Sequence, residues 1–135
     1  MIKSFLISAF CIFDKNRKNA ITIEGQIVNI ADEIAQRTHD TDDGLRSKRL
    51  NIPELLSHSL IRKMIRFNSS KKNEIEEAFA KDENKTILKI IGMMIKYYVN
   101  EVVRNSLDNL SAYKIINYKD VLRNDLQIVS FSNKF

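Results

Sequence analysis

The sequence is poor in the residues that make tight turns and covalent cross-links. Its 135 residues include three glycines, one proline, one cysteine and no tryptophan. An all-β fold needs many turns, so the shortage of glycine and proline argues against one. The lone Cys11 excludes an intramolecular disulfide, and it lies in an apolar run typical of a buried small side chain. Nothing therefore points to an oxidising compartment, and we expect a cytoplasmic protein.

Apolar residues recur at helical spacing along most of the chain. Hydrophobic residues make up 44% and charged residues 29% of the sequence, as in soluble globular proteins. A chain of this size can bury roughly two-thirds of its unfolded surface, which is enough for a core. We predict an all-α protein, a single helical domain over residues 1–135 with about five or six helices. The longest helix is expected near residues 85–107. Its core side chains should include Met93, Met94, Tyr97 and Tyr98.

Proline and polar clusters indicate where other elements begin and end. Pro53 fits the first turn of a helix. The apolar stripe expected for that helix is Leu56, Leu60, Met64 and Phe67. A loop at residues 68–72 and a short helix near residues 74–81 should follow. Residues 126–132 fit either the edge of a last helix or an extended segment.

The first residues of the chain differ from the rest. Residues 1–13 hold one lysine followed by a nine-residue apolar run, which resembles a short signal peptide. However, no small-residue cleavage site follows, and the run is too short to span a bilayer. We expect there a core strand or helix, or a piece of helix cut from its usual neighbours. A polar loop at residues 14–19 should follow, and we expect no membrane partner.

The net charge of +5 and the sequence pI of about 9.4 suit anionic partners such as nucleotides or nucleic acid. The basic residues are scattered, and no aromatic residues interleave with them. The charge pattern therefore supports a nucleic-acid partner only weakly.

The chemistry in this sequence is concentrated in residues 22–50. Thr22 can cap a helix with its hydroxyl, and Gly44 is the expected helix end. At about 100° per residue, one face of this helix is apolar and should pack. That apolar face consists of Ile23, Ile27, Ile30 and Ile34. The opposite polar face consists of Asp32, Gln36, His39 and Asp43, with Asp40 at its edge.

Two interpretations of this polar face are open. It can be the solvated acidic face of an ordinary surface helix, as in most amphipathic helices. It can also present ligands, because carboxylates with a histidine suit divalent cations. The sequence has no phosphate-binding glycine loop, no cysteine pair for zinc and no nucleophile elbow.

The segment from Thr22 to Arg46 carries two motifs in succession. Residues 24–35 read Glu-x-Gln-Ile-Val-x-x-Ala-Asp-Glu-Ile-Ala, and residues 39–46 read His-Asp-x-x-Asp-Gly-Leu-Arg. Together they closely resemble the deoxyguanosine triphosphate triphosphohydrolases, HD-domain phosphohydrolases that cut a dNTP to the nucleoside and tripolyphosphate. Weaker resemblance continues at residues 90–95 and 129–132.

This resemblance implies a partial HD-domain-type helical bundle and assigns roles to residues of the polar face. Asp32 corresponds to a metal ligand, and Gln36 and Asp40 correspond to substrate-contacting positions. The family usually has a tyrosine where this chain has Gln36. Residues with a candidate supporting role are His39, Asp43 and Arg46.

The same resemblance implies that the metal site is incomplete. The family uses a divalent metal of the Mg or Mn class, held by a His and a His-Asp pair that precede the ligand matched by Asp32. The pair His39-Asp40 follows Asp32, and no histidine lies upstream of it. Such a site needs about three protein ligands. We therefore expect the C-terminal part of a dGTP-hydrolysing enzyme, truncated and inactive alone, with residues 1–20 a divergent N-terminal segment.

Two other functions are compatible with the sequence. The chain can be a non-catalytic regulatory or assembly module that docks on a complete dNTPase, either as part of a homo-oligomer or beside a complementing chain. It can also be an unrelated helical nucleic-acid-binding protein, an interpretation that depends on charge alone.

Overall fold

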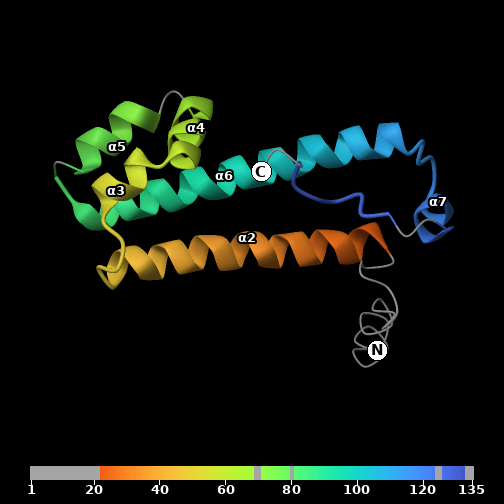
Figure 1. Ribbon diagram of the computed structural model, residues 1–135, viewed down its shortest axis with the longest axis horizontal. Helices are drawn as coiled ribbons and strands as arrows, with labels where there is room; N and C mark the ends of the chain where they lie inside the picture. Colours follow the sequence, from red (N-terminus) through yellow and green to blue (C-terminus); the bar gives the residue numbers. More distant parts are fainter. Residues whose placement is uncertain (1–21, 69–70, 80, 124–125, 133–135) are drawn as a thin grey trace. The chain divides into compact units, whose positions relative to one another are not determined.

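The computed structural model describes residues 22–68, 71–79, 81–123 and 126–132 (Figure 1). All regular structure in these residues is helical, which confirms the predicted all-α fold. The helices are α2 (Ile23–Arg46), α3 (Ile52–Ser57), α4 (Ser59–Phe67), α5 (Lys71–Phe79), α6 (Glu83–Ala112) and α7 (Tyr118–Arg123). The expectations for residues 1–20, Cys11 included, lie outside the described residues.

The chain divides into two compact units. The central unit is Ile34–Asn100, and the terminal unit combines Met1–Glu33 with Glu101–Phe135. The long helices α2 and α6 contribute residues to both. The single-domain assignment for the whole chain stays a prediction, and each unit is described by itself below.

The central unit has an apolar core built mainly by α4, α5 and the first part of α6. Tyr97 packs edge-on against Phe67, with ring centroids 5.4 Å apart. An ion pair of 3.0 Å between Lys89 and Glu74 joins α6 to α5. The buried apolar residues of α6 in this unit are Ile87, Ile90, Met93, Met94, Tyr97 and Tyr98. The core positions predicted for the two methionines and two tyrosines are therefore confirmed.

His58 interrupts the helix that the sequence predicts from Pro53 to Phe67. Its backbone is extended, at φ −66° and ψ 137°, so it ends α3 and begins α4. The Nδ1 atom of its ring accepts a hydrogen bond from the Leu60 N–H at 3.4 Å. The predicted stripe is also incomplete, because Met64 is fully buried whereas Phe67 is 52% exposed. Pro53 does lie in the first turn, as expected, behind the cap residue Asn51.

The terminal unit is organised around a non-helical segment, residues 126–132, held by side-chain amides. The buried Gln26 on α2 accepts from the N–H groups of Ile128 and Val129 at 2.8 and 3.0 Å, and donates to the Leu126 carbonyl at 3.1 Å. From α6, Asn105 donates to the Ser130 carbonyl at 3.0 Å. Asn109 likewise donates to the Ile128 carbonyl at 2.8 Å. In Figure 1 the segment runs between the first turns of α2 and the last turns of α6. No residue of this segment is helical, so of the two predicted alternatives the edge of a last helix is wrong.

The packed face of α2 differs from the predicted one. Ile30 and Ile34 are buried as expected, but Ile27 is 50% exposed. Gln26 and Thr38 are buried instead, because both side chains satisfy their hydrogen bonds locally or against residues 126–132. A prediction based on apolar residues alone therefore places the packed face of α2 at a different angle around the helix axis from the observed one.

The two ends of α2 show one correct and one wrong prediction. The Thr22 hydroxyl accepts from the Gly25 N–H at 3.1 Å, so the predicted cap is confirmed. The helix continues through Gly44 to Arg46, and Lys48 takes the left-handed conformation at φ 60°. Gly44 instead leaves room for the Leu50 side chain, because a Cβ at Gly44 would lie 2.7 Å from Leu50 Cδ1. Within the described residues, no helix has the length and apolar character needed to cross a membrane.

Candidate functional site

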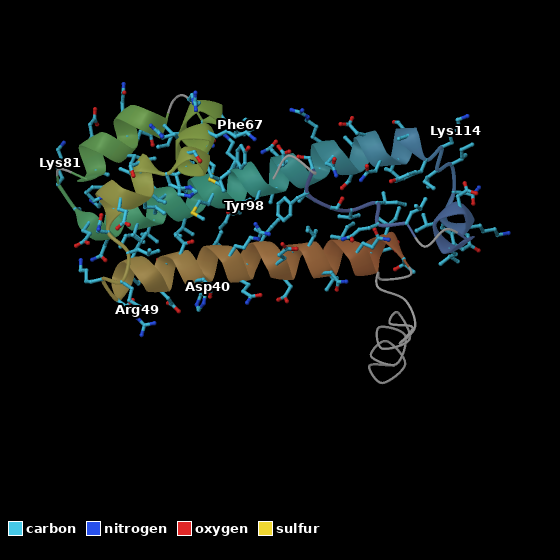
Figure 2. All side chains as sticks on the ribbon, in the orientation of Figure 1. Asp40, Arg49, Phe67, Lys81, Tyr98 and Lys114 are labelled. Carbon is cyan, nitrogen blue, oxygen red and sulfur yellow. The ribbon has the colours of Figure 1, made fainter. Side chains whose placement is uncertain are left out.

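The residues with predicted roles lie on one uninterrupted helix, α2. Asp32, Gln36 and Asp40 are spaced four residues apart, so they project from successive turns of α2 on one side. Each of the three is exposed, and Asp40 is labelled in Figure 2. The buried residues of α2, which include Ile30, lie roughly opposite. The polar face is thus solvent-accessible in this chain and turned away from the core.

His39 and Asp43 form a loose pair at the edge of this face. His39 Nδ1 lies 3.7 Å from Asp43 Oδ2, one helical turn away. Both side chains are largely exposed to solvent, so an ion pair between them stabilises the helix only slightly. Neither residue is held rigidly enough by this contact to fix a ligand geometry.

Arg46 is engaged by other side chains of the central unit. Its Nε donates to both carboxylate oxygens of Asp42, at 2.9 and 3.0 Å. Its NH1 group also lies 3.4 Å from the Asn84 side-chain oxygen on α6. The Asp42 hydrogen bond is the main cause that raises the pKa of Arg46. Arg46 therefore serves here to tie the end of α2 to the start of α6, and Lys48 does the same through an ion pair with Glu83.

Arg37 is the second arginine of α2 with a defined partner. Its guanidinium carbon lies 5.9 Å from the centre of the Tyr98 ring on α6, within the range of a cation–π contact. Burial raises the pKa of Tyr98, and the charge of Arg37 offsets part of that increase. Figure 2 labels Tyr98 on α6. This contact was not foreseen, because nothing in sequence spacing links residues 61 positions apart.

The donor set in the described residues does not make a metal centre. No group of three or more His, Cys, Asp or Glu side chains gathers anywhere among them. Asp32 can offer one carboxylate, but a divalent ion needs several oxygen or nitrogen ligands. The described part of the chain therefore does not fit a resident metal by itself.

Gln26 is the motif residue whose importance the sequence analysis missed. It lies in the first motif, but its amide holds the backbone of Ile128 and Val129 rather than a ligand. A glutamine on the apolar side of an amphipathic helix was the available signal. Such a buried amide must find partners, and here they come from about a hundred residues away.

Comparison with known proteins places these features in a family context. The chain is 32% identical over 116 residues to a deoxyguanosinetriphosphate triphosphohydrolase-like protein of Geobacter metallireducens, covering 82% of this chain and 27% of that protein. A protein of the same description from Pelagibacter ubique is 36% identical over 122 residues, covering 89% of this chain and 31% of that protein. One from Geobacter sulfurreducens is 34% identical over 112 residues, covering 83% and 28%.

The chain thus spans little more than a quarter of the length of the curated relatives it matches. No protein-family model matches it. No solved structure matches it either. The predicted resemblance is confirmed at the level of sequence relationship, over most of this chain.

Proposed function

We propose that this chain, which is related over most of its length to deoxyguanosinetriphosphate triphosphohydrolase-like proteins, carries one wall of the nucleotide site of an HD-domain dNTP triphosphohydrolase. The observation that supports it best is the unbroken polar face of α2. Asp32, Gln36 and Asp40 are exposed together on one side of a helix whose other side is packed. The polar face can contact the residues that complete the site while the opposite side of α2 stays packed as it is.

Each residue of the polar face has a role suited to its chemistry. The Asp40 carboxylate can accept a hydrogen bond from a sugar hydroxyl, and the Gln36 amide can donate to a phosphate oxygen or accept from the sugar. Asp32 would supply one oxygen ligand to a divalent metal of the Mg or Mn class. His39 and Asp43 lie at the edge of the face, where ligand contacts, rather than their own loose pairing, would have to order them.

The remaining ligands must come from residues that this chain does not contribute in its described part. For that reason we assign no catalytic step to the metal and propose that the chain is inactive alone. The substrate of the completed site would be dGTP or another dNTP, with the nucleoside and tripolyphosphate as products. The cytoplasm, where dNTPs are made and used, is the proposed location.

The test is dGTP hydrolysis with Mn²⁺ or Mg²⁺, followed by tripolyphosphate release. The purified chain alone should give no release above buffer. Co-expression with the part of the Geobacter metallireducens relative outside the matched residues should restore it. In the restored complex, Asp32→Asn should lower the rate at least about a hundredfold, since even outer-shell residues of metal sites cost 10- to 100-fold.

Asp108→Asn is the matched control, because Asp108 is also an exposed aspartate but belongs to a different helix, α6. It should leave the restored rate unchanged. Robust turnover by the chain alone would contradict the proposed inactivity. Equal rates for the Asp32 and Asp108 variants would remove Asp32 from the site.

A non-catalytic module is the second candidate, favoured by the lack of a three-ligand group among the described residues. Such a module would dock on a complete dNTPase, in a homo-oligomer or beside a complementing chain, and alter its activity. Adding this chain to the intact Geobacter metallireducens relative separates the two functions. A changed rate that survives Asp32→Asn would favour the module.

A further inference from the structure

The first part of α6 has an apolar surface that its own unit leaves exposed. Leu88 is 62% exposed, and Ile95 and Val99 are exposed as well. Their spacing of seven and four residues puts them on one side of the helix. The buried residues Ile90, Met94 and Tyr97 lie on the other side. We call Leu88, Gly92, Ile95 and Val99 the α6 stripe.

Gly92 lies in the middle of the α6 stripe and is itself unexplained by this chain. A Cβ at this position would meet nothing within 4 Å, so no neighbour in the described structure requires glycine. Glycine inside a helix is destabilising relative to alanine, because it loses more backbone freedom on folding. The open space above it suits close approach by a second helix.

Charge gives the α6 stripe an orientation. Lys85 and Lys96 are both exposed and flank the stripe along the same edge of the helix. A partner helix with carboxylates along one side would match this edge. An apolar stripe with a polar border is the ordinary composition of a protein–protein contact.

We propose that the α6 stripe is the docking face for the part of the relatives' fold that this chain does not span. That part is nearly three-quarters of the length of the Geobacter metallireducens and Geobacter sulfurreducens relatives. A contact between it and this segment would use apolar surface that this chain leaves exposed. The occupant is an amphipathic helix from that part, with an apolar face over Gly92 and acidic side chains toward Lys85 and Lys96. This proposal uses the sequence relationship and the exposed surface, and it does not depend on the proposed chemistry.

The experiment co-expresses this chain with the part of the Pelagibacter ubique relative outside the matched residues. It then measures how much of the two proteins co-purifies. Ile95→Glu should reduce the recovered complex about tenfold or more, because a charge would be buried in an apolar contact. Ile116→Glu is the matched control. Ile116 is 89% exposed and lies outside the α6 stripe, so its variant should bind like the wild type.

Two measurements keep folding separate from docking. Circular dichroism melting of the chain alone should give the same midpoint for Ile95→Glu as for Ile116→Glu, since both side chains are exposed. Gly92→Ala should raise that midpoint, whereas Gly92→Leu should reduce co-purification without lowering it. Lys96→Glu should reduce co-purification more at low salt than at high salt.

Several results would overturn the proposal. One is equal recovery of complex with Ile95→Glu and Ile116→Glu. Another is a wild-type chain that does not co-purify at all. A third is light scattering that shows a dimer of this chain dissociated by Ile95→Glu, since a second copy would then be the occupant. Co-purification without dGTP hydrolysis would leave the docking face intact and refute only the proposed enzyme function.

Discussion

The central and terminal units are stabilised by different chemistry. The central unit holds most of the buried apolar side chains of the described residues, contributed by five helices. The terminal unit buries few, and it fixes residues 126–132 through Gln26, Asn105 and Asn109. The hydrophobic effect has no preferred direction and grows with the apolar area buried, whereas amide hydrogen bonds depend on distance and direction. We therefore expect the central unit to determine overall stability and the terminal unit to open locally.

The largest expected effect comes from the core of the central unit. Ile90 is fully buried, and Ile90→Ala should lower the free energy of unfolding by about 2–5 kcal/mol through lost burial and the cavity left behind. Leu88→Ala, two residues away but 62% exposed, should change it by less than about 0.5 kcal/mol. Urea unfolding followed by circular dichroism measures both. Similar losses for the two variants would mean that the central core does not control stability.

The next effect tests whether amide bonds hold the terminal unit. Gln26→Ala leaves the buried N–H groups of Ile128 and Val129 without their acceptor, at a cost of about 1–3 kcal/mol for each such group. Amide hydrogen exchange at those two positions should accelerate, while exchange in α4 and α5 stays at the wild-type rate.

Gln36→Ala, on the exposed face of the same helix, is the control and should leave all of these rates unchanged. If Gln26→Ala accelerated exchange in both units alike, the two units would unfold together. The terminal unit would then not open separately from the central unit, despite its different stabilising interactions.

The smallest effect is a pH dependence confined to the central unit. Burial raises the pKa of Tyr98 above its unfolded value of about 10. Below that pH the neutral phenol is present in both states, so its contribution to stability is complete. As pH rises through the folded pKa this contribution is lost, because the unfolded chain releases the proton first. Tyr98→Phe should therefore flatten the alkaline decline in unfolding free energy.

Tyr113→Phe is the control for that measurement, since Tyr113 is an exposed tyrosine of the terminal unit. Its variant should decline with pH as steeply as the wild type. An equally flat curve for both variants would show that burial of Tyr98 does not cause the alkaline loss.

Helix periodicity predicted most of the fold because long helices repeat the same local signal many times. The predicted helix near residues 85–107 is α6, extended to Glu83–Ala112. The Thr22 cap followed from one hydroxyl at a helix start. The break at His58 did not, because an apolar stripe continues across it and the extended backbone is set by local hydrogen bonds.

The candidate site was predictable only as a set of positions along one helix. Spacing placed Asp32, Gln36 and Asp40 on a common exposed side. It could not predict that Arg46 is held by Asp42 and Asn84, or that Arg37 lies over Tyr98. Those contacts join separate helices, and their partners are decided by tertiary packing rather than by sequence spacing.

Gln26 has a consequence for how this segment changes over evolutionary time. The Gln26 side chain holds residues 126–132 in place, whereas the side chains of Asp32 and Asp40 are exposed and make no hydrogen bond or ion pair among the described residues. A gene copy released from selection for hydrolysis, yet still required to fold, should retain glutamine at this position and lose the two aspartates by drift. The motif residues retained in such a copy would then be those needed for folding, and their presence would not indicate hydrolysis.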